Sequence, residues 1–351
     1  MRFDKPVLAI DVGGGTQDIF LFQPGQPVEN CVQMVLPSQT QVIARQISEI
    51  TRRRKDLFLT GSLMGGGASS SAVRKHLAAG CRVYANPNAA KTLNDDLDKV
   101  RAMGVIITEN PPENCISVTM GDINLPALTA ALKPFAVELP EHIAVAVQDH
   151  GESLGISNRL FRFQHWQRFM EEVGGDIRGL LYKEIPSYLT RMLAVKAAVP
   201  HAYLADTGTA AIWGALEDPQ VDDRRAEGVI LLNVGNQHTV GVLLKGWQVY
   251  GLFEHHTGLL NPVKLIDYVN RLRCGVLTHA EVYQDGGHGC YISPHYSPAQ
   301  GFSLVAVTGP KRAMSQEAGY YLAVPHGNMM LAGAFGLVAA LAAQQRNRQE
   351  Q

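Results

Sequence analysis

Apolar residues occur in short runs along the chain, and their spacing alternates between that of strands and that of helices. Strand-like runs cover residues 7–12, 18–22, 57–60, 104–108, 143–147, 229–234 and 239–244. Helical spacing covers residues 158–172, 187–198 and 209–216, and residues 65–71 form a glycine- and serine-rich segment that we expect to be flexible. The alternation predicts an α/β fold.

One unit of this pattern occurs twice, once in each half of the chain. Residues 7–12 lead through a glycine turn at 13–16 into a second apolar run, and residues 229–234 do the same through 235–238. A glycine turn between two apolar runs is typical of a β-hairpin, so we predict an antiparallel hairpin in each half. A chain of 351 residues is long for one core, and we expect two domains, residues 1–219 and 220–351.

The first turn has the composition of an anion site. Glycines without side chains let successive N–H groups converge on a phosphate, and the hydroxyl of Thr16 adds a donor. Asp11 would repel a bare phosphate, but it can hold Mg²⁺ directly or through water. An ordinary hairpin turn is the alternative. No GxxxxGK[ST] segment follows, so neither a P-loop nor a Rossmann turn is indicated.

Five segments in this order resemble the motifs of the actin, Hsp70 and sugar-kinase superfamily. They are the first phosphate motif at 11–18, the connecting helix at 204–215, the second phosphate motif at 232–239, the adenosine motif at 305–311 and the closing small-residue helix at 331–336. The resemblance implies a two-lobed actin-like ATPase fold made of duplicated ribonuclease H-like domains. It also implies ATP or ADP with Mg²⁺ between the lobes.

The same resemblance assigns site residues. It implies phosphate contacts from Gly13, Gly14, Gly15, Thr16, Gln17, Asn233, Gly235, Asn236 and Gln237, adenosine contacts from Gly309, Pro310 and Lys311, and a metal at Asp11. Two positions depart from the superfamily pattern. Asn233 stands where an acid is usual, and Pro310 stands where a second glycine is usual. Both departures favour slow hydrolysis or binding without turnover.

Candidates for catalysis follow two further strands. Asp206 opens the connecting helix, where it would be either a general base for an acceptor hydroxyl or simply the N-cap of the helix. Asp149 and His150 follow the run 143–147, which suits the rim of a site and suits a solvated loop nearly as well. The histidine- and glycine-rich stretch 255–295 predicts a mobile substrate loop, with a transition-metal site as the alternative.

Three functions are compatible with such a site. The first is a Mg²⁺-dependent ATPase that acts on a protein partner, the second is a small-molecule kinase with Asp206 as base, and the third is a nucleotide sensor without hydrolysis. The net charge of −1 gives no reason to expect nucleic acid or a membrane as partner. The basic run at 52–55 is interpreted as a solvated helix end.

Cysteine usage bears on location and on cofactors. Five widely spaced cysteines indicate a reducing, cytoplasmic compartment, and the polar start of the chain predicts no signal peptide. At a finer level the chain resembles a prokaryotic family labelled pyruvate formate-lyase activating enzyme. A radical activase of that type needs CxxxCxxC for an iron–sulfur cluster, and this spacing is absent from the sequence. We therefore expect no cluster.

Overall fold

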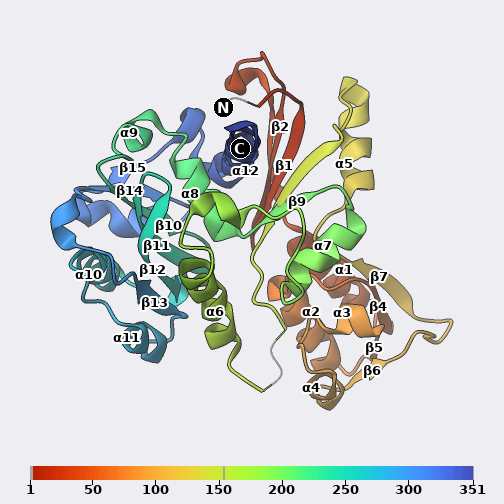
Figure 1. The fold of residues 1–351 in the computed structure, drawn as a ribbon. Coiled ribbons are helices and arrows are strands. Elements are labelled where there is room, and N and C mark those ends of the chain that lie inside the picture. Colours follow the sequence, from red (N-terminus) through yellow and green to blue (C-terminus); the bar gives the residue numbers. More distant parts are fainter. Residues whose placement is uncertain (1–2, 153–154, 351) are drawn as a thin grey trace.

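The computed structural model describes residues 3–152 and 155–350 and has a mixed α/β architecture (Figure 1). Its strands form three sheets, with the orders β3-β2-β1-β8-β9, β6-β5-β4-β7 and β13-β12-β11-β10-β14-β15. Figure 1 shows the first two sheets on one side of the molecule and the third on the other, with helices α8 and α12 between them. Among the described residues, no helix is both long enough and apolar enough for a membrane span.

The first sheet contains the predicted N-terminal hairpin. Its strands are β1 (Val7–Val12), β2 (Thr16–Phe22), β3 (Val32–Pro37), β8 (His142–Val147) and β9 (Tyr203–Ala205). β1 pairs antiparallel with β2 and parallel with β8. Asp11 lies directly opposite Asp18 in the hairpin. Residues opposite one another in a ladder present their side chains on the same face, so the two carboxylates are neighbours.

The third sheet repeats this arrangement. Its strands are β10 (Val229–Val234), β11 (His238–Lys245), β12 (Gln248–His256), β13 (Gly289–Ile292), β14 (Leu304–Thr308) and β15 (Tyr321–Leu322). β10 pairs antiparallel with β11 and parallel with β14, as β1 does with β2 and β8. Both predicted hairpins are therefore confirmed, and the repeat extends to the parallel strand beside each of them.

The four-stranded sheet is entirely parallel and lies beside helices α1 to α4. Its strands are β4 (Leu57–Gly61), β5 (Val83–Ala85), β6 (Val105–Ile107) and β7 (Ile116–Met120), and the helices are α1 (Gln39–Arg52), α2 (Gly67–Ala78), α3 (Pro87–Ala90) and α4 (Leu97–Ala102). The expectation of a flexible segment at 65–71 is wrong, because α2 begins inside it. Ala72 and Val73 join the core under this sheet, and the Ser69 hydroxyl donates to Gly66 O at 2.6 Å, which fixes the first turn of the helix.

The remaining helices cover the sheets and connect them. They are α5 (Leu125–Leu132), α6 (Asn158–Glu171), α7 (Thr190–Ala198), α8 (Thr207–Ala215), α9 (Pro219–Asp222), α10 (Pro262–Arg273), α11 (His279–Gln284) and α12 (Ala332–Glu350). The predicted helices at 158–172, 187–198 and 209–216 correspond to α6, α7 and α8. As expected, α1 ends at the basic run 52–55.

Helices α8 and α12 touch through their backbones. A Cβ added at Gly214 would lie 1.8 Å from Ala332 O, and one added at Gly336 would lie 2.0 Å from Ala210 O. Only glycine permits so close an approach. α12 also packs against β1, β2 and β8, and α6 packs against β13. Contacts therefore cross the predicted domain boundary at 219/220 in both directions, and the division into 1–219 and 220–351 stays a prediction.

The stretch 255–295 is not the loop that its composition suggested. It holds the end of β12, helices α10 and α11 and strand β13. The signal for α10 is present in the sequence, because Leu265, Tyr268, Val269 and Leu272 recur at helical spacing and all four are buried. The expectation of a loop rested on the histidine and glycine content of this stretch, and it overlooked the helical spacing of the apolar residues.

Candidate functional site

The glycine turns of the two hairpins lie against each other and both line a cavity of about 570 Å³. A Cβ added at Gly14 would lie 2.4 Å from Nε2 of Gln237, and one added at Gly15 would lie 3.3 Å from Nδ2 of Asn236. The turns are also closed alike, since Gly13 N donates to Thr16 O at 2.8 Å and Gly235 N donates to His238 O at 2.9 Å. The two halves of the repeat thus meet turn to turn.

Two carboxylates, each with a buried oxygen, lie in the first hairpin next to its turn. Asp11 and Asp18 line the cavity, and the Oδ1 atom of each is buried without a hydrogen-bond partner among the described residues. Burial, with Asp18 and Asp206 nearby, raises the pKa of Asp11 well above its ordinary value, and burial raises the pKa of Asp18 to about 7. Paired, unsatisfied carboxylate oxygens are the donor set that Mg²⁺ prefers, so the site fits the ion that the sequence suggested.

Asp18 gives a pH-dependent prediction for metal-free protein. Its pKa is about 7 in the folded state and about 3.9 in the unfolded chain. Between these values the folded state binds more protons than the unfolded chain. The free energy of unfolding therefore falls as the pH rises from about 4 to 7, and it stays lower above pH 7. We expect Asp18→Asn to raise the melting temperature at pH 8 by at least about 2–4 °C, the change for 1 kcal/mol, and by clearly less at pH 5.

Thermal unfolding in EDTA at the two pH values measures this effect. Asp223→Asn, which changes an exposed carboxylate, is the control and should shift little at either pH. An equal shift for Asp18→Asn at both pH values would contradict a pKa near 7 for Asp18 in the folded state.

Most of the predicted phosphate and adenosine residues line the cavity. They are Gly13, Gly14, Thr16, Asn233, Gly235, Asn236, Gln237, Gly309 and Pro310. Asn233 donates from Nδ2 to the Thr308 hydroxyl at 3.1 Å, which ties the second hairpin to β14. Gly309 has φ +98°, and a Cβ there would lie 2.4 Å from Val234 O. The turn after β14 therefore requires glycine at this position.

Gly15, Gln17, Lys311 and Asp206 lie outside the set of described residues that line the cavity. Gln17 is turned toward β3, where its amide donates to Pro37 O at 3.0 Å. Lys311 is exposed, and its backbone N–H donates to Val234 O. The Gln17 amide and the Lys311 backbone are thus engaged within the protein. Ligand contacts from the two residues stay a prediction.

Asp206 is engaged on both oxygens. Its Oδ1 caps α8 through Gly208 N at 2.9 Å and accepts from Nη2 of Arg162 at 2.8 Å, while its Oδ2 accepts from Nη1 of Arg162 at 2.7 Å. The N-cap interpretation is confirmed. Donors from Arg162 and Gly208 already occupy both oxygens, so neither is free to accept a proton from an acceptor hydroxyl, and the geometry disfavours Asp206 as a general base.

Asp206→Asn separates the two interpretations. The amide keeps the cap but weakens the pair with Arg162, so we expect a lower melting temperature and a turnover within about tenfold of wild type. Loss of a general base costs roughly a hundredfold or more. A loss of that size in variant protein that is folded and binds nucleotide normally would restore Asp206 to the mechanism. Phosphate release and thermal unfolding are the two measurements.

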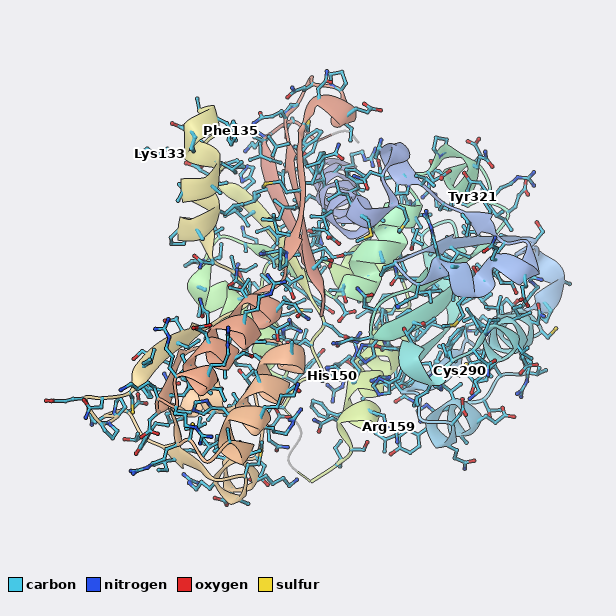
Figure 2. All side chains as sticks on the ribbon, turned by 180° about the vertical axis from the view of Figure 1, so that it is seen from behind. Lys133, Phe135, His150, Arg159, Cys290 and Tyr321 are labelled. Atoms are coloured by element: carbon cyan, nitrogen blue, oxygen red, sulfur yellow. The ribbon has the colours of Figure 1, made fainter. Side chains whose placement is uncertain are left out.

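Asp149 also has a structural role. It is 1% exposed, and its carboxylate accepts from Gly151 N and from Met192 N, each at 2.8 Å. These bonds hold the loop after β8 against α7. His150 next to it lines the cavity, and Figure 2 shows it near the centre of the molecule, between the two sides.

Three more histidines surround His150. The ring centroids of His238 and His288 lie 5.5 and 5.7 Å from that of His150, and His256 lies 4.8 Å from His238. Burial lowers the pKa of His150 well below its ordinary value, that of His238 to about 3 and that of His288 to about 4. These imidazoles are therefore neutral at pH 7.

Sequence reasoning missed several residues of the cavity wall. The chief ones are Lys91, Arg159, Arg191 and the glycines at 65–67 before α2. Arg191 forms a bidentate pair with Asp122 at 2.8 Å on both nitrogens, and Lys91 pairs with Glu152 at 2.9 Å. A glycine run that precedes a helix is a signal for an anion site, and it could have drawn attention to residues 65–67. No local sequence pattern distinguishes Lys91, Arg159 and Arg191 from the other basic residues of the chain.

A comparison with protein families gives a match over most of the chain. The family described as "Putative pyruvate format-lyase activating enzyme (DUF1786)" matches residues 64–314. The chain belongs to this family. A search of curated proteins gave no match. The matched segment of this family member includes the second hairpin, the histidines and the loop at 65–67, while the first hairpin precedes it.

Solved structures resemble this family member only weakly. The ROK hexokinase from Thermus thermophilus is 11% identical, with 97% of this chain and 99% of that chain covered, at a TM-score of 0.31. A protein described as a putative sugar kinase from Cytophaga hutchinsonii is 10% identical, with 96% and 99% covered, at 0.30. A ROK family transcriptional regulator, a homologue of the E. coli MLC protein, is 9% identical, with 97% and 79% covered, at 0.31. TM-scores this low do not establish a shared fold.

Proposed function

We propose that this protein is a Mg²⁺-dependent ATPase that holds ATP or ADP in the cavity between its two hairpins. The observation that carries the proposal is the turn-to-turn contact of Gly14 with Gln237 above the paired, unsatisfied carboxylates of Asp11 and Asp18. Two glycine turns can grip phosphates from both sides, and a cation at the carboxylates makes the polyphosphate compatible with them. Mg²⁺ would neutralise the charge that develops on the transferring phosphoryl group.

The chain's own residues divide the remaining work in this proposal. The turns at 13–16 and 235–238 orient the phosphates, and Gly309 with Pro310 lies where the adenosine would be. Asn233 is uncharged, so the acidic side of the metal site comes from the first hairpin alone, which favours slow turnover. In the actin-like arrangement the lobes 1–219 and 220–351 would close over the nucleotide about the crossing of α8 and α12, and closure would transmit the nucleotide state to a protein partner.

A small-molecule kinase is the second candidate, and one observation favours it. The cavity continues past the turns to Lys91, Arg159, Arg191 and the glycines at 65–67. Lys91 and Arg191 are paired there with Glu152 and Asp122. The N-terminal end of α2 and these side chains suit an acceptor with a carboxylate or phosphate group that would compete for the arginine and the lysine. Because Asp206 is bound by Arg162, a kinase mechanism would need another base.

A nucleotide screen tests the proposal and separates its variants. We expect ATP and ADP to raise the melting temperature with Mg²⁺ and to do so much less in EDTA, because a ligand that binds only the folded state stabilises it by mass action. Phosphate release without an acceptor identifies the ATPase, release that requires an anionic acceptor identifies the kinase, and a shift without release identifies a sensor. No shift with any nucleotide at millimolar concentration would refute the proposal.

The family description raises the question of an iron–sulfur cluster, and the expectation from the sequence can be tested directly. The cysteines lie apart, with Cys31 before β3, Cys81 before β5, Cys115 before β7, Cys274 after α10 and Cys290 in β13. We expect anaerobic reconstitution with iron and sulfide to leave no bound cluster and no visible absorption band. A stoichiometric cluster that is lost on replacing Cys274 or Cys290 would overturn this expectation.

A further inference from the structure

Three of the cavity histidines present their ring nitrogens to one point. Within residues 3–152 and 155–350, His150, His238 and His288 form a set in which one ligand atom from each lies within 4.8 Å of the others. They come from three separate elements: the loop after β8, the first residue of β11 and the turn before β13. His238 directly follows Gln237, so the cluster adjoins the second glycine turn.

Four of the six ring nitrogens of this cluster are buried but unsatisfied. Both nitrogens of His238 and both nitrogens of His288 lack a hydrogen-bond partner among the described residues. Buried polar atoms in folded proteins are nearly always bonded, and several orphans at one point call for an explanation. By contrast, the neighbouring His255 is accounted for, because it bonds Asp285 and the His256 carbonyl. Hydrogen bonds within the protein account for the buried ring of His255, but none accounts for the ring nitrogens of His238 and His288.

The charges beneath the cluster also favour a cation. Glu254 is fully buried in β12 and accepts from Gln148, Arg162 and the Trp166 indole. Arg162 is the cation of this network, and it pairs with Glu254 and Asp206 together. One positive charge therefore faces two carboxylates, which leaves a buried surplus of one negative charge. The backbone of His288 is fixed to this network, because His288 N donates to Glu254 O at 2.9 Å.

We propose that His150, His238 and His288 bind a divalent transition-metal ion of the zinc type, with one coordination position open to the cavity. Imidazole nitrogen is a ligand that such an ion prefers, and three protein ligands with a free fourth position are typical of catalytic rather than structural zinc sites. Tetrahedral coordination at about 2.0–2.1 Å places the nitrogens about 3.4 Å apart. The nitrogens now lie within 4.8 Å of one another, so each separation has to shorten by at most about 1.4 Å.

This metal site is distinct from the Mg²⁺ site. Asp11 and Asp18 offer oxygen ligands to a hard cation, whereas the histidines offer only nitrogen. His256 lies beside the cluster, with its ring centroid 4.6 Å from that of His288, but it is outside the set of three convergent ligands. Binding of the transition metal requires no nucleotide, so it is measured without one.

The test is a Zn²⁺ titration of tag-free, chelator-treated protein. We expect one Zn²⁺ per chain, a higher melting temperature and no comparable effect of Mg²⁺ on this site. His238→Gln and His288→Gln should each weaken Zn²⁺ by more than about 100-fold, which exceeds the cost of losing an outer-shell partner. His295→Gln is the matched control, because His295 is exposed outside the cluster, and it should bind as wild type does.

X-ray absorption of the wild-type zinc protein provides a second measurement that does not depend on the folding of a variant. We expect a zinc shell of nitrogen and oxygen with about three imidazoles and no sulfur. A sulfur-containing shell would overturn the proposal. It would also be overturned by a stoichiometry well below one, or by a loss in His295→Gln equal to that in His238→Gln.

Discussion

Replacing Gly14 with leucine is expected to abolish the rise in melting temperature that Mg²⁺ and ATP give the wild type. The turns are in contact at this point, where even a Cβ would lie 2.4 Å from the Gln237 amide. The amide tip can move aside for one carbon, but the branched side chain of leucine would then occupy the space between the turns. At a ligand concentration 100 times its Kd, the lost stabilisation is about 2.7 kcal/mol.

The control for this variant is Gly258→Leu. Gly258 is exposed, with open space where its Cβ would lie, so the same substitution there should leave the nucleotide shift intact. The unliganded Gly14→Leu protein should unfold cooperatively near the wild-type temperature. A full nucleotide shift in Gly14→Leu would place the nucleotide somewhere other than between the turns.

Arg162→Leu is expected to be the most destabilising single change at the site. The guanidinium is buried and bonds Asp206, Glu254 and the Asp149 carbonyl. Removing it leaves two carboxylates buried without their cation, and breaking a buried pair in this way costs about 3–5 kcal/mol. Denaturant unfolding measures the loss. Arg52→Leu, which removes an exposed arginine from the end of α1, should change little.

The loss in Arg162→Leu should also depend on pH. Burial alone would raise the pKa of Glu254, and Arg162 is the main group that holds it well below its ordinary value. Without Arg162 the pKa rises, so the folded variant binds a proton that the unfolded chain releases above about pH 4. Its stability therefore falls as the pH rises, and the deficit relative to wild type should be larger at pH 8 than at pH 5. A deficit below about 1 kcal/mol at pH 8 would contradict the central place of Arg162.

Local patterns in the sequence were sufficient for the hairpins and for most of the phosphate wall. Gly13, Gly14 and Asp11 share one turn, so their proximity is fixed by a few residues of chain. Asp18 was within reach of the same reasoning, because the register of a tight hairpin places it opposite Asp11. The partner of Asp206 could not be predicted in the same way. Arg162 lies within a helix whose periodicity was recognised, yet nothing in that periodicity shows that a charged side chain faces the core.

The histidine cluster illustrates a different difficulty. His150, His238 and His288 are separated by 88 and 50 positions in the printed sequence. They meet only because β8 ends, and β11 and β13 begin, at the same side of the cavity. Composition pointed to a histidine-rich stretch at 255–295, but two of the three residues lie outside it. Tertiary proximity of this kind follows from sheet topology and cannot be obtained from spacing along the chain.

The most direct test of the nucleotide site is a crystal structure with a non-hydrolysable ATP analogue and Mn²⁺ in place of Mg²⁺. The account predicts the triphosphate between the turns at Gly14 and Gly235. It also predicts an anomalous Mn²⁺ peak that contacts Asp11 or Asp18 directly or through one water. A nucleotide bound away from both turns, or a crystal without nucleotide at saturating concentration, would contradict it.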